Sequence, residues 1–283
     1  MKKIYVHYPY SNYVKVYEDG NGVVLFGSDT CRDFGNPRWS SGEIIFTDHT
    51  NIRYKPPPNK LLVLEPPRVC PLSHEDEYLK TFERVYTFGN SELENVRHYR
   101  YGIPPLWPEV TEIITRPWNE RINKVCCITG NKYPERVAFL HAYANFFKTL
   151  GLDLDVWGVP GFEGLPWYRG EVPGGPKEKR EWLSKYRYCL ALENTCMKRY
   201  LSEKLLDGLA SGCICFYYGG ADKDFYPEVP WHWVSNSMQL GFTVFSHQRY
   251  LSSLEKALPD LKQLNFTSVW RQILTDFSTE EGK

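Results

Sequence analysis

The stretch from Tyr186 to Tyr218 constrains the fold of this chain more than any other part of it. The apolar run 188–192 predicts a strand, and the polar residues 193–198 that follow predict a loop. A helical spacing comes next in four leucines, Leu201, Leu205, Leu206 and Leu209. Gly212 ends this predicted helix, and the aromatic run 213–218 predicts a second strand. A strand–helix–strand unit of this kind favours a parallel sheet, with ligands bound where the strands end.

Polar residues gather where the predicted helix begins. Ser202 suits the cap position, and Glu203 and Lys204 fall in the first turn. A helix N-terminus offers free N–H groups and a partial positive charge, so together with Lys204 it would hold a phosphate. Glu203 would accept hydrogen bonds from sugar hydroxyls. An ordinary capped helix, with Glu203 and Lys204 on a solvated face, explains the same residues.

Two segments resemble the donor-binding motif of the α1,3-fucosyltransferase family, which runs F-E-N-S, four variable residues, then Y-V-T-E-K. Here the segments 192–195 (LENT) and 200–204 (YLSEK) stand at that spacing without a gap. In the family the Asn, the Tyr and the Glu-Lys pair hold the nucleotide sugar. The resemblance therefore implies donor-binding roles for Asn194, Tyr200, Glu203 and Lys204. The family pattern differs at Leu192, at Ser202 and in the CICFYYGG segment, which leaves the identity of the donor sugar open.

Composition narrows the function classes. The 283 residues carry 34 basic and 34 acidic side chains, and this balance argues against a nucleic-acid-binding protein. Aromatic residues make up 16% of the chain, which fits stacking on sugar rings and fits an aromatic-rich core equally well.

The sequence shows no membrane or secretion signal. It has no apolar run near the ~20 residues that span a bilayer, and its N-terminus lacks the apolar segment of a signal peptide. The eight cysteines show neither C-x-x-C pairs nor zinc spacing. We therefore expect a cytoplasmic protein with reduced cysteines.

The alternation of predicted strands and helices indicates an α/β protein. A Pro-rich linker over 102–123, with a short helical piece at 109–115, separates two such regions. We predict an N-terminal Rossmann-like domain on the acceptor side (1–115), a C-terminal Rossmann-like domain that binds the nucleotide sugar (116–265), and a final helix in 266–283 that packs back on the first domain. Two Rossmann-like domains facing a cleft constitute the GT-B arrangement.

Glu65 directly follows a predicted strand at 61–64 and precedes Pro66 and Pro67, which cannot continue a central strand. This places the carboxylate at the carboxyl edge of the sheet, where doubly wound folds bind ligands, although a solvated loop carboxylate is equally compatible. The fucosyltransferase family has a strand followed by E-S-P, whose Glu is the proposed general base. The resemblance implies that role for Glu65.

Arg136 begins a strongly periodic helix over 136–150, and Pro134 and Glu135 suit the first turn of that helix. The family has an arginine here that contacts the donor diphosphate, so the resemblance makes Arg136 a donor-binding candidate; a structural ion pair is the alternative.

Asp153 and Asp155 form a D-x-D motif, which suggests a metal-dependent glycosyltransferase. A half-exposed strand explains both residues without a metal, so we predict none. The sequence also predicts a Gly/Pro-rich loop over 162–179 and helices at 249–258 and 268–277.

The resemblance implies an inverting, metal-independent glycosyltransferase with no cofactor. It would move a sugar from a nucleotide-diphosphate donor, GDP-fucose in the family, to a glycan hydroxyl. A UDP-sugar donor such as UDP-xylose on the same scaffold is the alternative. A glycosidase and a carbohydrate-binding module are more remote.

Overall fold

The computed structural model describes residues 2–7, 15–19, 22–27, 43–47, 60–102, 109–130, 133–158, 162–172, 178–231, 234–235, 247–265 and 271. The chain divides into two compact units, one formed by residues 1–101 with 266–283 and the other by residues 102–265. The second unit begins at residue 102, so residues 102–115 belong to it.

The first unit contains a sheet with the strand order β2-β3-β1-β4-β5-β6-β7. All neighbouring pairs are parallel except β2 with β3. The strands are β1 Lys2–His7, β2 Lys15–Asp19, β3 Gly22–Gly27, β4 Glu43–Thr47, β5 Lys60–Leu62, β6 Arg84–Thr87 and β7 Val96–His98. A 3₁₀ helix, η2 (Pro71–His74), and a single helical turn, α1 (Asp76–Leu79), connect β5 to β6. The strand predicted at 61–64 is confirmed as β5, which spans Lys60–Leu62.

The second unit contains a fully parallel sheet with the order β10-β9-β8-β11-β12-β13. Its strands are β8 Ile122–Thr129, β9 Leu154–Gly158, β10 Tyr168–Gly170, β11 Tyr186–Leu192, β12 Ile214–Tyr218 and β13 Val234–Ser235. From β8 the chain moves outward through β9 and β10, then returns to the other side of β8 and continues outward from β11. This reversal is the topology of a doubly wound Rossmann-like fold.

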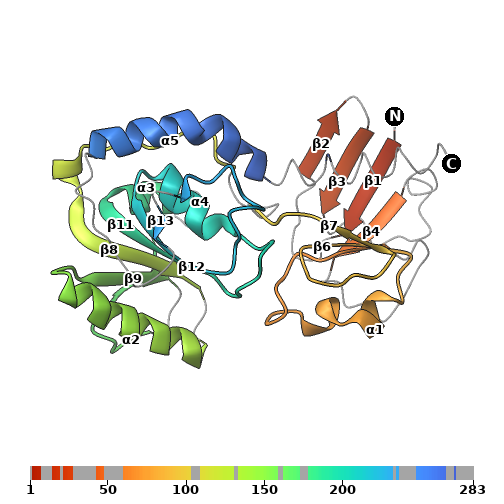
Figure 1. Ribbon diagram of the computed structural model, residues 1–283, viewed down its shortest axis with the longest axis horizontal. Helices are drawn as coiled ribbons and strands as arrows, with labels where there is room; N and C mark the ends of the chain where they lie inside the picture. Colours follow the sequence, from red (N-terminus) through yellow and green to blue (C-terminus); the bar gives the residue numbers. More distant parts are fainter. Residues whose placement is uncertain are drawn as a thin grey trace. The chain divides into compact units, whose positions relative to one another are not determined.

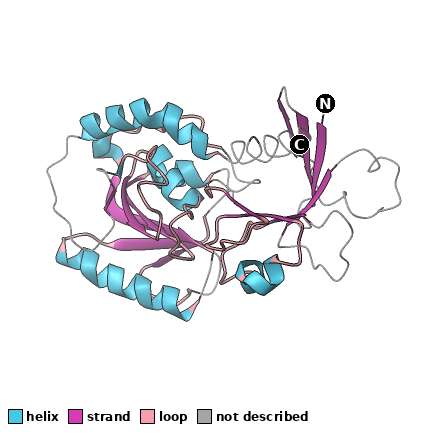
Figure 2. Cartoon of the chain, turned by 45° about the vertical axis from the view of Figure 1, so that its right-hand side comes forward, coloured by secondary structure: helices cyan, strands magenta, loops and turns pink. Residues whose placement is uncertain are grey.

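Helices cover both faces of this sheet (Figure 1). On one face lies α2 (Pro134–Thr149), and on the other lie α3 (Lys179–Ser184), α4 (Glu203–Ala210) and α5 (His247–Leu261). Short 3₁₀ helices are η3 (Trp118–Glu120) and η6 (Lys262–Leu264). Figure 2 shows the strands of the unit between these helical layers. Because both faces are covered, strand residues of either parity are apolar: Val125 and Cys127 face α2, and Cys126 between them faces α4.

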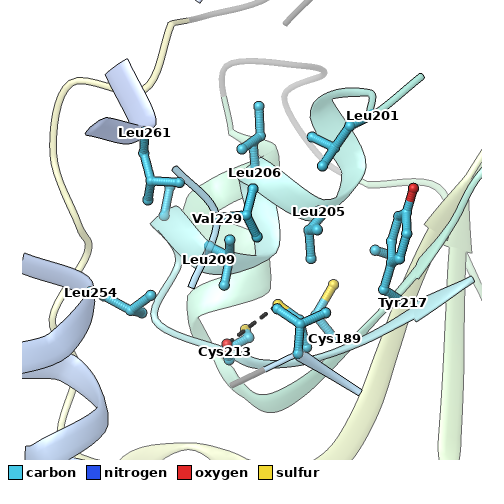
Figure 3. Close-up of a cluster of buried hydrophobic side chains, with 14 of the residues drawn as sticks. Cys189, Leu201, Leu205, Leu206, Leu209, Cys213, Tyr217, Val229, Leu254 and Leu261 are labelled. Atoms are coloured by element: carbon cyan, nitrogen blue, oxygen red, sulfur yellow. Dashed lines mark hydrogen bonds between the residues drawn. The ribbon is translucent and has the colours of Figure 1, made fainter. Parts of the chain in front are cut away.

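Helix α4 is the most deeply buried helix of this unit. Its leucines pack with residues of β11, β12 and α5 into one apolar cluster (Figure 3). Gly208 faces the sheet so closely that a Cβ atom would lie 2.7 Å from the Cys215 sulfur. Gly212 has a φ of 66° and ends the helix as predicted, since L-residues with side chains rarely adopt this conformation. The strand, helix and strand predicted for 186–218 are thus confirmed.

Five of the described cysteines are buried free thiols: Cys126, Cys127, Cys189, Cys213 and Cys215. Burial raises the pKa of the Cys127 thiol to about 12. These residues therefore act as small apolar side chains of the core. None of the helices in the described ranges has the length and apolar character that a bilayer span requires.

Three predictions about local structure need correction or lie outside the described residues. Segment 109–115 is irregular, not helical: its β-branched residues disfavour a helix, and Ile114 N–H donates to Ala210 O at 2.6 Å instead of to a carbonyl within the segment. The predicted loop 162–179 contains β10, and Phe162 and Trp167 of this segment are buried against the α2 face. The helix predicted at 268–277 lies outside the described residues apart from Arg271.

Candidate donor site at the carboxyl ends of β8 and β11

The winding direction of the second sheet reverses between β8 and β11. These strands are parallel neighbours, with Cys189 opposite Cys126. From their carboxyl ends the chain enters α2 on one face and α4 on the other. The two connections therefore diverge at the carboxyl ends of these strands, which is where doubly wound proteins bind their ligands.

Arg136, in the first turn of α2, joins the ends of the two strands. Its guanidinium donates to Thr129 Oγ1 at 2.8 Å, at the end of β8. It also donates to the carbonyls of Leu192 at 3.3 Å and Glu193 at 3.0 Å, and to Asn194 Oδ1 at 2.7 Å. The side chain is buried, and these four partners are neutral acceptors. Arg136 therefore holds protein groups at the ends of the two strands, and its predicted contact with a donor diphosphate stays a prediction.

Glu193, the residue after β11, was not among the predicted site residues, yet it organises the start of α4. Its carboxylate accepts hydrogen bonds from Ser202 N at 2.8 Å and from Ser202 Oγ at 2.6 Å. Lys204 Nζ lies 3.6 Å from the same carboxylate. Burial raises the pKa of the Glu193 carboxyl, although Lys204 and the bonds from Ser202 act in the opposite direction. The residue type was visible in the sequence, but its burial was not.

Ser202 caps α4 as predicted. Its Oγ accepts from Lys204 N at 3.4 Å, and the Lys204 ammonium donates to the same oxygen at 3.0 Å. The ammonium also lies 3.4 Å from Glu203 Oε1. The N-terminus of α4 and a cation thus lie together beside the end of β11, a combination suited to an anion.

The solvated face considered for Glu203 is wrong, because this carboxylate is buried within a row of alternating charges. Lys179 on α3 lies 3.5 Å from Glu203 and 2.9 Å from Asp207, and Arg180 lies 2.7 Å from Asp207. Burial lowers the pKa of Lys179, but the carboxylates of Asp207 and Glu203 outweigh it and raise the pKa above its ordinary value. The row therefore neutralises buried charge and fixes α3 against α4.

The remaining predicted donor-binding residues lie in the connection between β11 and α4. Asn194 is half-buried and oriented by Arg136, whereas Tyr200 is buried with 3% of its surface exposed. Tyr200 N–H donates to Met197 O at 3.1 Å, in the turn that precedes α4. Arg136, Asn194, Ser202, Glu203 and Lys204 are thus brought together, with Tyr200 packed under the same connection.

A second loop, residues 219–226, holds this connection from the side of β12. A Cβ atom on Gly219 would meet the Tyr217 hydroxyl and would lie 2.8 Å from Glu193 Cγ. A Cβ atom on Gly220 would meet the backbone nitrogen of Met197. Farther along, Asp222 N–H donates to Lys198 O at 3.1 Å. The glycines at 219 and 220 are therefore required by close backbone approach.

Glu65 belongs to the first unit. It follows the carboxyl end of β5 and is partly exposed, and its carbonyl accepts a hydrogen bond from His74 Nε2 at 2.8 Å. Burial lowers the pKa of His74, against the bond to Glu65, which raises it. The predicted role of Glu65 as a general base stays a prediction.

The D-x-D segment differs from the expected half-exposed strand face. Asp153 is exposed, but Asp155 is buried and lies 2.7 Å from Arg169 Nε and 3.3 Å from Lys124 Nζ. Asp155 is therefore a buried ion-paired residue of β9. Within the described residues, no group of three or more His, Cys, Asp or Glu side chains is arranged to hold a metal ion.

No protein-family model and no curated protein sequence matches this chain. Among solved structures, it is similar to a UDP-forming α,α-trehalose-phosphate synthase from Burkholderia xenovorans, with a TM-score of 0.51, 11% identity and 98% of each chain covered. It is also similar to a UDP-forming synthase of the same kind from Burkholderia vietnamiensis, with a TM-score of 0.51, 10% identity and full coverage of both chains. An α1,3-fucosyltransferase structure with GDP aligns over 92% of this chain and 81% of its own, at 16% identity and a TM-score of 0.44. The likeness to the synthases shows the fold, an α/β fold of the GT-B type.

Proposed function

We propose that this chain is a glycosyltransferase whose second unit binds a nucleotide-diphosphate sugar at the carboxyl ends of β8 and β11. The observation that carries the proposal is the cluster at the reversal point of the sheet. There, Asn194 is fixed by Arg136 at 2.7 Å, and Lys204 lies at the N-terminus of α4. The GT-B-type fold supports this proposal, because folds of this kind bind ligands at the same edge of the sheet.

The chemistry requires charge stabilisation at the departing diphosphate. The bond between the anomeric carbon and the diphosphate oxygen breaks, and the diphosphate leaves with the electron pair. Lys204 and the N-terminus of α4 are suited to stabilise that developing charge. Asn194, Tyr200 and Glu203 are the residues that we expect to orient the sugar and the ribose.

The acceptor hydroxyl forms the new bond to the anomeric carbon and gives up its proton. We assign Glu65 as the base that takes this proton, with inversion at the anomeric carbon and without a metal. The assignment rests on the position of Glu65 after β5 and on the E-P-P resemblance. The acceptor would be a glycan hydroxyl.

We propose GDP-fucose as the donor, on the resemblance of segments 192–195 and 200–204 to the fucosyltransferase motif. A UDP-sugar donor is the second candidate, because the two Burkholderia proteins that share the fold are UDP-forming.

A thermal-shift and calorimetric screen tests the function. The ligands are GDP, UDP, CMP, GDP-fucose, UDP-xylose and UDP-glucose, each with and without EDTA. A ligand present at ~100 Kd raises the free energy of unfolding by about 2.7 kcal/mol. A GDP-selective shift that EDTA leaves unchanged supports the proposal. A UDP-selective shift would mean that the donor is a UDP-sugar. If no nucleotide binds, the proposed nucleotide-sugar donor is wrong. If EDTA abolishes transfer activity and Mn²⁺ restores it, the proposed metal independence is wrong.

A further inference from the structure

The main chain of Glu193 is fixed on both sides. Its N–H donates to Tyr218 O at 2.8 Å at the end of β12, and its carbonyl accepts from Arg136 Nη2 at 3.0 Å. Asn194, the next residue, is held by the same guanidinium. The Glu193 side chain therefore starts from a defined position at the carboxyl end of β11.

Both carboxylate oxygens of Glu193 are used. One accepts from Ser202 N, and the other accepts from Ser202 Oγ. The carboxylate has no exposed surface, so these bonds and the nearby Lys204 ammonium are the described groups that compensate its burial.

The Glu193 carboxylate also determines the orientation of the Ser202 hydroxyl. A hydroxyl has one hydrogen to donate and two lone pairs to accept with. Since that hydrogen is directed to Glu193, the lone pairs of Ser202 Oγ are left for Lys204, whose backbone N–H and ammonium both donate to this oxygen. The position of the Lys204 ammonium therefore depends on Glu193 through a direct charge contact and through Ser202.

We propose that Glu193 is a positioning residue that fixes the Lys204 ammonium and the N-terminus of α4 relative to Asn194, so that both address the diphosphate group of a nucleotide ligand. This rests on the proposed function. Glu193 itself is buried behind Ser202 and contacts no ligand in this proposal.

The variant that tests it is Glu193→Gln, which keeps the side-chain length but removes the charge. In this variant the amide oxygen can still accept from Ser202 N, but the amide nitrogen then faces Ser202 Oγ. Because an amide nitrogen donates and cannot accept, the Ser202 hydroxyl is no longer held with its hydrogen toward residue 193. The matched control is Asp155→Asn, which also neutralises a buried, ion-paired carboxylate of the same unit, away from α4.

Affinity for a nucleoside diphosphate and for the matching nucleoside, GDP with guanosine and UDP with uridine, is measured by calorimetry. We expect Glu193→Gln to weaken diphosphate binding at least about tenfold, the size of a lost charge-assisted interaction, and to leave nucleoside binding unchanged. In a Lys204→Gln background the same substitution should cost less than it does with Lys204 present, because only the N-terminus of α4 is left for Glu193 to position. An unchanged diphosphate affinity, or an equal loss in the Lys204→Gln background, overturns the proposal.

A spectroscopic signature tests the positioning without any ligand. The Ser202 amide proton, which donates to a carboxylate, should move upfield in the amide spectrum of Glu193→Gln and stay in place in Asp155→Asn. If the wild type binds no nucleoside diphosphate, the proposed function fails. In that case an unmoved Ser202 amide additionally overturns the role of Glu193 in fixing α4, whereas an upfield shift supports that role.

Discussion

The guanidinium of Arg136 donates to Asn194 Oδ1 at 2.7 Å, across the reversal point of the second sheet. One residue belongs to the helix that follows β8 and the other to the loop that follows β11, 58 positions apart in sequence. This contact determines which group of the Asn194 amide faces away from Arg136. Because the oxygen accepts from the guanidinium, the amide nitrogen is the group directed away from Arg136.

Replacing Arg136 with lysine should destabilise the second unit by about 2–4 kcal/mol. An ammonium cannot reach Thr129 Oγ1, two carbonyls and Asn194 at once, so buried acceptors lose their donor. Urea unfolding measures the effect. Arg169→Lys, at a partly exposed ion pair, is the control and should change stability by less than about 1 kcal/mol. A loss of similar size in both variants would contradict the assigned role of Arg136.

Replacing Lys204 with alanine should lower the transfer rate roughly 10²-fold or more, because the substitution removes a charge stabiliser of the departing diphosphate. Initial-rate measurements with the donor found in the nucleotide screen check this. The control is Lys124→Ala, which removes a half-buried ion-paired lysine of the same sheet. Turnover at the wild-type level in Lys204→Ala would remove this residue from the mechanism.

The substitution Gly220→Ala should reduce the free energy of unfolding by about 1–3 kcal/mol, because the new methyl group would overlap the backbone of residues 196 and 197. Gly89→Ala provides the comparison. There the new methyl meets the Thr87 hydroxyl at 3.1 Å and the His74 ring at 3.2 Å, both side chains that can shift. Denaturant unfolding measures both losses. Equal losses in the two variants would mean that the loop 193–198 shifts to accommodate the new methyl group, against the prediction.

The stability difference between Glu193→Gln and the wild type should change with pH. Burial raises the folded-state pKa of Glu193 above its ordinary value of 4.5, so between these values the folded state binds more protons than the unfolded state. The groups that face this carboxylate are Ser202, Lys204, Glu203 and Tyr217. In this window wild-type stability falls as pH rises, by at most about 1.4 kcal/mol per pH unit for one proton.

The glutamine variant lacks this proton, so its stability should gain on that of the wild type from about pH 4.5 upward. Unfolding curves of both proteins across the weakly acidic to neutral range measure the gap, with Asp155→Asn as a second reference. If the stability of Glu193→Gln relative to the wild type stays constant or falls with rising pH, the raised pKa of Glu193 is contradicted.

The sequence predicted the elements of the site better than its contacts. Helical spacing in 201–209 and the stop at Gly212 are local properties, and they placed α4 correctly because propensity and burial agree there. Ser202 was likewise recognisable as a cap. The irregular course of segment 109–115 was missed because the groups that accept from its backbone N–H groups, Ala210 O and Asn265 Oδ1, lie far away in sequence.

Burial of carboxylates accounts for a second group of misses. Nothing in the spacing of Glu193, Glu203 or Asp155 distinguishes a solvated acid from a buried one. Each is buried because a cation or a hydroxyl from another element compensates it: Ser202 and Lys204 for Glu193, Lys179 for Glu203 and Arg169 for Asp155. Such pairings are properties of the assembled sheet and its helices, which a single sequence does not contain.

The N-terminal and C-terminal ends of the second unit contact each other. The Asn265 amide accepts from Val110 N at 2.9 Å and donates to Val110 O at 3.3 Å, and a Cβ atom on Gly102 would press on the Leu264 carbonyl. The polypeptide thus enters and leaves this unit at neighbouring points, in the manner of a domain inserted into a host chain. Residues 102–265 should therefore fold when excised. Joining their ends with a short Gly/Ser linker and opening the chain at an exposed loop should give a circular permutant that retains nucleotide binding.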